Sequence, residues 1–156
     1  MRVTKQIVKE FLLSSALYGT ISRERLENYL TLYDRATKVT SHLTGMPSGG
    51  GSDRNALLAN LADSFNNASD WVSRVAERRD LVVRFLDAAP LEELDRFVLK
   101  ARYVQRKKWT EILFLCNQKQ KLSERNLFYI HNRALSECAS WVNKTGRFRD
   151  EILDIS

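Results

Sequence analysis

A long stretch without helix breakers restricts the folds that are open to this chain. Neither proline nor glycine occurs from Asp53 to Ala88, and Ser52 or Asp53 is suited to cap a helix there. Apolar residues recur in this stretch at alternating steps of three and four, at Leu58, Leu61, Phe65, Ala68, Val72, Val75, Val82 and Leu86. Arg79 is the polar member of this heptad seam, where it either fixes the register as an interface residue or extends its guanidinium into water. A helix of this length spans roughly 50 Å, so it needs a long partner to cover its apolar stripe.

The upstream residues offer one such partner. Apolar positions at helical spacing predict a helix over residues 3–18 and another ending near Leu43, with a break or kink at Gly19. The glycine-rich residues 45–52 predict a flexible connector, because the Lys-Ser/Thr pair of a phosphate-binding loop is absent. If the helix that ends near Leu43 packs against the long helix across this loop, residues 1–89 form an antiparallel, coiled-coil-like helical hairpin that serves as an oligomerisation arm. The alternative partner is the same helix of another subunit, which gives a homodimer through the seam.

A second unit is predicted to begin at Pro90 and to end at residue 145. The residue before a proline is pushed out of the helical conformation, so the long helix ends there. A helix with one apolar face follows and ends in the basic turn at residues 105–108, and a two-turn helix spans residues 109–116. Residues 146–156 form an acidic and apolar tail.

The start of the last predicted helix has the strongest local signals. Ser123 is suited to the N-cap, and Leu122 and Leu127 occupy the positions of a hydrophobic staple. Glu124 complements the helix dipole, and Gly146 predicts the end of the helix. The predicted fold class is therefore all-α, a long helical hairpin followed by a three-helix unit.

Composition and charge narrow the classes of function. A 156-residue chain with 44% apolar and 28% charged residues has ordinary globular composition. The N-terminus lacks the pattern of a signal peptide, and no run of about 18 apolar residues occurs, so we expect a cytoplasmic protein that binds no membrane. Residues 100–133 hold nine basic and two acidic residues, while the whole chain carries a net charge of +6. This local excess favours a polyanionic partner such as nucleic acid.

Catalytic chemistry has no recognisable site in the sequence. His42 and His131 are isolated, no serine or cysteine lies in a nucleophile motif, and no acidic cluster suggests a metal. Cys116 and Cys138 are expected to be reduced thiols, and the histidines do not complete a zinc-ligand spacing with them. We therefore expect neither an enzyme nor a bound cofactor or metal.

Four short motifs carry a resemblance to a known family. Arg102-Tyr103-Val104, Trp109-Thr-Glu-Ile112, Ser123-Glu-Arg125 and His131-Asn-Arg-Ala-Leu135 together resemble the C-terminal helix-turn-helix of phage-encoded ArpU-like and RinA-like late transcriptional regulators. Those domains in turn resemble region four of bacterial sigma factors. The segment from Thr40 to Asp53 is similar to the junction in small phage proteins that carry such a domain behind a helical hairpin. The chain departs from the family in having Arg106 and Asn117 where glycine is usual, and in a longer turn before Ser123.

The resemblance implies a function in the bacterial host cell. It indicates a DNA-binding regulator of phage transcription that binds double-stranded DNA, with RNA polymerase as a further candidate partner. In a helix-turn-helix, the start of the second helix meets base edges while nearby basic residues contact phosphates. The predicted base contacts are Arg125, Asn126, Tyr129 and Asn132. The predicted phosphate contacts are Lys107, Lys108, Lys119, Lys121 and Arg133.

A protein partner is the alternative reading of the same helix. Phe128 and Tyr129 are adjacent aromatic residues on or near its predicted outer face, and such residues suit either a protein interface or contact with thymine methyl groups. A degenerate helix-turn-helix would then bind another regulator or a polymerase subunit, with Phe128, Tyr129 and Arg79 as interface candidates.

Overall fold

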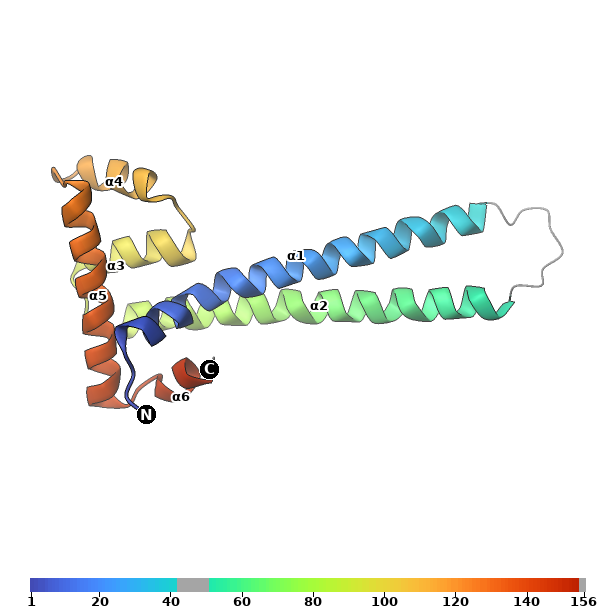
Figure 1. The fold of residues 1–156 in the computed structure, drawn as a ribbon, viewed down its shortest axis with the longest axis horizontal. Helices are drawn as coiled ribbons and strands as arrows, with labels where there is room; N and C mark the ends of the chain where they lie inside the picture. The colour runs from blue at the N-terminus through green and yellow to red at the C-terminus, as the bar shows by residue number, and fades with distance from the viewer. Residues whose placement is uncertain (42–50, 155–156) are drawn as a thin grey trace. The chain divides into compact units, whose positions relative to one another are not determined.

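The fold was obtained as a computed structural model, which describes residues 1–41 and 51–154. These residues form six α-helices, a π-helical turn and no strand, which confirms the predicted all-α class (Figure 1). In chain order the elements are α1 (Lys5–Ser41), α2 (Gly51–Ala88), α3 (Glu93–Leu99), the π-helical turn η1 (Lys100–Val104), α4 (Trp109–Asn117), α5 (Glu124–Thr145) and α6 (Arg149–Leu153).

The first long helix does not break where the sequence predicted. α1 is continuous from Lys5 to Ser41, so of the break or kink predicted at Gly19 the break is wrong. A single glycine costs a helix only about 1 kcal/mol relative to alanine. Packing beside it offsets that cost, since the neighbouring Tyr18 ring lies edge-on to Trp71 of α2 at 5.6 Å.

The predicted connector at residues 45–52 lies outside the described residues, apart from its last two. Gly51 and Ser52 already belong to α2, which begins slightly before the caps expected at Ser52 and Asp53. The helix then continues to Ala88, as the absence of proline and glycine predicted.

The chain divides into two compact units, and the divisions fall within the long helices. One unit contains residues 1–17 and 77–156, and the other contains residues 18–76. The boundary expected from the sequence lay at Pro90, where α2 has just ended.

The larger unit contains most of the buried side chains. Its main core includes Phe11 and Leu12 of α1, Phe85 and Leu86 of α2, and residues from η1, α5 and α6. Phe11 and Phe85 meet edge-to-face at 5.3 Å. A segment from the start of the chain therefore supplies part of the core in which the C-terminal helices pack.

Two side chains of this unit join separate elements through hydrogen bonds. The Arg96 guanidinium donates to the carbonyls of Leu86 and Ala89, each at 3.0 Å, and so binds backbone carbonyl groups at and just beyond the end of α2. The Asn143 side chain pairs with Val3, accepting from its backbone N–H at 2.9 Å and donating to its carbonyl at 2.7 Å. α5 is thereby fixed against the N-terminal segment.

The C-terminal residues are more structured than the sequence predicted. Residues 149–153, expected to form a tail, are helical as α6, and Ile152 is fully buried in the main core. Phe148, which precedes this helix, lies edge-on to Phe85 at 5.6 Å. The tail therefore folds because Phe148 and Ile152 can be buried on the core.

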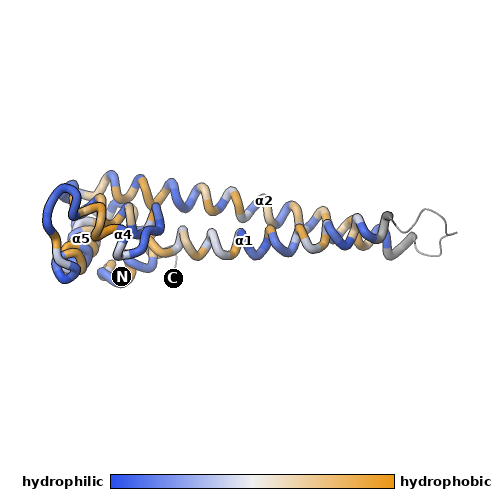
Figure 2. Tube along the Cα trace, turned by 90° about the horizontal axis from the view of Figure 1, so that it is seen from above, coloured by the Kyte–Doolittle hydropathy of each residue, from blue (hydrophilic) through white to orange (hydrophobic). Residues whose placement is uncertain are grey.

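The smaller unit is a two-helix hairpin of α1 and α2 residues (Figure 1). The Tyr18 ring packs against Trp71. Further along α1, the Tyr29 ring packs at 5.5 Å against Phe65, which comes before Trp71 in α2. Ring pairs in this order establish an antiparallel arrangement, as the hairpin prediction required. Hydrophobic residues recur along both helices in Figure 2. Arg79 lies just beyond the hairpin, and its side chain is exposed.

Candidate nucleic-acid interface

Three helical segments of the larger unit share a core of their own, and we refer to α3 with η1, α4 and the first half of α5 as the three-helix unit. Each segment contributes two buried side chains: Val98 and Ala101, Ile112 and Cys116, and Leu127 and Ile130. Leu94, Trp109, Leu113 and Leu122 pack around this cluster. The apolar spacing of each segment therefore places α4 and α5 on a common support.

The start of α5 is fixed as the sequence predicted. The Ser123 hydroxyl accepts the backbone N–H of Asn126 at 3.2 Å, so Ser123 is the N-cap. Leu122 packs against the cluster that contains Leu127, which is the arrangement of a hydrophobic staple. At the other end Gly146 adopts φ +71° and donates to the Val142 carbonyl at 2.8 Å, so the predicted stop is confirmed.

One face of α5 is directed away from the core. Leu127, Ile130 and Ala134 are buried, as expected. The opposite positions by helical spacing hold Arg125, Tyr129, Asn132 and Ser136, which we call the α5 outer face; all four side chains are exposed. Asn126 is also exposed and lies beside this face. The four residues predicted to contact bases are thus all accessible near the start of one helix.

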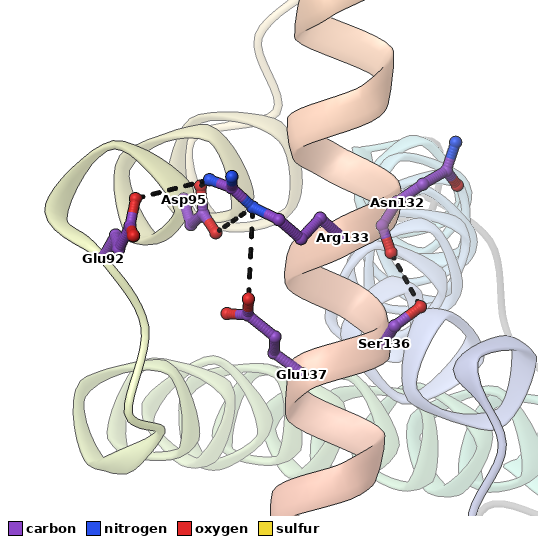
Figure 3. A network of polar contacts seen from close by, with 6 residues as sticks. All are labelled: Glu92, Asp95, Asn132, Arg133, Ser136 and Glu137. Carbon is purple, nitrogen blue, oxygen red and sulfur yellow. Dashed lines mark hydrogen bonds and ion pairs between the residues drawn. The ribbon is translucent and has the colours of Figure 1, made fainter.

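Arg133 is engaged within the protein, although it was predicted as a phosphate contact. Its guanidinium binds both carboxylate oxygens of Asp95, at 2.6 and 3.2 Å, and Asp95 is completely buried (Figure 3). Glu92 and Glu137 lie further away, at 3.4 and 4.0 Å. The hydrogen bond with Asp95 is the main reason why the pKa of Arg133 is raised. This ion pair joins α3 to α5 and leaves Arg133 less free for DNA than its neighbours.

Asp95 was not predicted from the sequence, although its spacing from neighbouring apolar residues indicated a buried position. Asp95 lies four residues after Leu91 and three before Val98, both of which are buried. Helical spacing therefore placed a carboxylate on an apolar face. A buried carboxylate needs a cationic partner, and Arg133 supplies it from a position 38 residues later.

The two adjacent aromatic residues of α5 have different surroundings. The Phe128 ring packs edge-on against Trp109 at 5.0 Å, which joins α5 to the start of α4. Tyr129 is 67% exposed. Tyr129 is consequently the more accessible of the two for a partner.

His131 lies between the two cores and is buried. Its Nε2 is 2.8 Å from the Tyr103 hydroxyl, and its ring lies edge-on to Trp109 at 4.9 Å. Burial is the largest cause that lowers the pKa of His131 to about 4, and Lys9 and Arg102 add to the effect. Burial likewise raises the pKa of Tyr103 to about 12. Both rings are therefore uncharged near neutral pH, and the pair joins η1 to α5.

The turn before α4 contains a strained residue. Arg106 adopts φ +57°, a left-handed conformation that is unfavourable for a residue with a Cβ atom. Around it the Lys107 N–H donates to the Ala101 carbonyl at 2.9 Å, and Arg102 donates to the Lys107 carbonyl at 3.1 Å. The Glu111 carboxylate accepts the Lys108 N–H at 2.7 Å, which caps α4.

The longer turn between α4 and α5 is closed by a side chain. The Asn117 carboxamide oxygen accepts the Leu122 N–H at 2.7 Å, and the backbone N–H groups of Lys119 and Gln120 donate to the Cys116 carbonyl. Asn117 ends α4 in a helical conformation. Asn117 stands where the family that the motifs resemble usually has glycine, and asparagine can adopt the left-handed conformation that glycine favours. Here Asn117 instead closes the turn through its side chain.

The predicted phosphate-contacting lysines occupy the two turns. Lys107 and Lys108 come directly before α4, whereas Lys119 and Lys121 come directly before α5. Lys108, Lys119 and Lys121 are exposed, and Lys107 is half-buried. Basic side chains therefore flank both ends of α4.

Neither a potential metal-binding cluster nor a potential membrane-spanning helix is found in the described part of the chain. No group of three or more His, Cys, Asp or Glu side chains that could hold a metal ion occurs in residues 1–41 and 51–154. Cys116 and Cys138 are both buried free thiols, and burial raises the pKa of each, to about 12 for Cys138. Within those same ranges, no helix combines the length and apolarity that a bilayer crossing requires.

Comparison with known proteins gives no match to a family model, a curated protein or a solved structure.

Proposed function

We propose that the protein is a DNA-binding transcriptional regulator of the phage type that its motifs resemble. In this proposal α4 and α5 are the two helices of a sigma-region-four-like helix-turn-helix, and α5 enters the major groove of double-stranded DNA. The observation that carries the proposal is the α5 outer face, where Arg125, Tyr129 and Asn132 are exposed immediately after a capped helix start.

The chemistry of these residues suits base recognition. An arginine can donate two hydrogen bonds to guanine, and an asparagine can pair with adenine through its amide. Each such pair contributes about 1 to 3 kcal/mol of discrimination against the wrong base. Arg125 is suited to the first role, and Asn126 or Asn132 to the second.

The lysines of the two turns suit the phosphate backbone. In a helix-turn-helix the first helix crosses the backbone, and Lys107, Lys108, Lys119 and Lys121 lie at the two ends of α4. Four phosphate contacts give a slope of log affinity against log salt of about −3.6, since each contact contributes about −0.9. Raising salt from 50 to 200 mM then weakens binding about 150-fold.

A binding titration with duplex DNA at several salt concentrations tests the proposal. We expect saturable binding with the slope given above. Lys121→Ala should reduce the slope by about 0.9 and weaken all sequences alike. Arg125→Ala should lower the preference for the best site about 5- to 160-fold, because it removes a base contact.

Lys144→Ala is the matched control for these variants. Lys144 is exposed in the last turn of α5, far along the helix from Ser123, and its substitution removes the same charge. Binding should change little. Absence of saturable binding at low salt would contradict the proposal, as would an equal loss in Lys144→Ala and Lys121→Ala.

The second candidate function is an interaction protein that binds another regulator or an RNA polymerase subunit through the same unit. The favouring observation is that Tyr129 is 67% and Phe114 65% exposed, because exposed aromatic residues are enriched at protein interfaces. Tyr129→Ala separates the two functions. Loss of partner capture with unchanged DNA affinity favours the protein interface, whereas loss of DNA affinity favours the groove.

A further inference from the structure

The hairpin of residues 18–76 has few fully buried side chains. Among the side chains described in residues 18–38 and 54–76, the buried ones are Ala36 and Ala68. Six large apolar side chains are 44–54% exposed: Leu26, Leu30, Tyr33, Leu58, Phe65 and Val72. Long helices in water depend on burial of an apolar face, so this arrangement leaves part of that stabilisation unused.

The six side chains belong to one face, which we call the hairpin face. On α1 the three residues follow helical steps of four and three, and on α2 they follow steps of seven. Tyr29 joins the two rows, because its ring lies 6.2 Å from Tyr33 and 5.5 Å from Phe65.

The heptad seam predicted on α2 therefore contains two sets of residues, one that faces α1 and one that is exposed. Leu61, Ala68 and Val75 are buried or half-buried, as positions facing α1 should be. Leu58, Phe65 and Val72 are about half exposed. These three remain available for another partner.

The size of the hairpin face fits a protein partner. Half-exposed side chains of this kind give a total of roughly 500 to 600 Å² of apolar surface. This lies at the upper limit of patches on monomeric proteins, about 300 to 600 Å². With the exposed small residues between its anchors, the face approaches the 800 Å² or so that each partner buries in a standard interface.

The α2 row is complementary to itself. Between its large residues lie Ala62, Ser69 and Ala76, which are exposed and also recur every seven residues. When a second α2 is placed antiparallel, with a two-fold axis at the level of Asn67, every large residue meets a small one. The facing pairs are Leu58 with Ala76, Phe65 with Ser69 and Val72 with Ala62.

We propose that the hairpin face binds a second copy of this chain, with the two α2 helices antiparallel about that axis. Alternating large and small residues at facing positions allow two helices to interdigitate. A parallel pair in register would place large residues against large ones and leave gaps between the small ones. A two-fold interface of this kind is closed, so association stops at the dimer and forms a four-helix bundle from two hairpins.

Sedimentation of the full chain over a range of concentrations tests the association. We expect a reversible monomer–dimer equilibrium. Ala62→Arg should raise the dissociation constant at least about 100-fold, because the new side chain occupies the space for Val72 of the other copy. Alanine 62 is exposed and arginine is a good helix former, so the monomer should keep its helicity and melting temperature.

Ala59→Arg is the matched control, since Ala59 is exposed on the α2 surface away from the hairpin face. It should leave the dimer unchanged. A monomer at all concentrations would overturn the proposal, and so would equal effects of the two arginine variants.

Disulfide trapping tests the register independently of affinity. The double variant Ala62→Cys with Val72→Cys should form a covalent dimer under mild oxidation, because these positions face each other across the interface. Either single variant should remain uncrosslinked, because the introduced cysteine of one chain lies about 15 Å along the helix axis from the same cysteine of the other chain. The pair Asn60→Cys with Arg74→Cys, at the same level but on another flank, should not crosslink. Crosslinking by a single variant, or by the control pair, would overturn the antiparallel register.

Discussion

Removal of the Arg133 guanidinium should destabilise the larger unit well beyond an ordinary surface substitution. Arg133→Met keeps much of the aliphatic side chain but leaves the Asp95 carboxylate buried without its two bonds of 2.6 and 3.2 Å. Breaking a buried ion pair by removing one partner typically costs about 3 to 5 kcal/mol. The Arg133 side chain is 35% exposed, so water can approach the site, and we expect a loss of about 2 to 3 kcal/mol.

Urea denaturation followed by circular dichroism measures this loss. Arg84→Met is the matched control, because Arg84 binds Asp80 at 2.9 Å with both side chains more than 60% exposed. Such a pair contributes about 0.5 kcal/mol. The reasoning would be refuted if both variants lost the same stability.

A double-mutant cycle assigns the loss to the pair. In Asp95→Asn with Arg133→Met no buried charge is left unpaired, so the double variant should lose less than the two single losses combined. We expect a coupling energy of at least about 1 kcal/mol. Additive losses would show that Arg133 and Asp95 stabilise the protein independently, contrary to the bidentate geometry.

Three further changes test local features of the three-helix unit. The lowered pKa of His131 means that the unfolded chain binds a proton between pH 6.5 and about 4 while the folded chain does not. Unfolding free energy should therefore be retained above pH 6.5 and fall by up to about 3 kcal/mol towards pH 4, and His131→Gln should flatten this part of a pH series of urea titrations. Arg106→Gly should raise the thermal midpoint, with a gain of about 0.5 to 1 kcal/mol, because φ is +57° there; a loss would show that the Arg106 side chain outweighs its backbone strain. Ser123→Ala removes the bond to the Asn126 N–H and should cost about 1 kcal/mol in the same assay, whereas an unchanged midpoint would mean that the cap contributes nothing.

The sequence by itself determined the features that depend on neighbouring residues. The cap at Ser123, the stop at Gly146 and the long α2 were all predicted, because each follows from backbone chemistry within one or two turns. The buried face of α5 followed from spacing alone, since residues three and four apart share one side of a helix. The exposure of Arg125 and Asn132 was the consequence of that same periodicity.

Only the tertiary structure decided what depends on residues far apart in the chain. Gly19 signals a break, yet α1 continues because its neighbour Tyr18 packs against Trp71. Arg133 is outward by spacing, but a buried Asp95 on another helix binds it. Residues 1–17 join the core of the C-terminal helices through Phe11 and Leu12. These outcomes depend on which surfaces meet, and burial acts between side chains without regard to their distance in sequence.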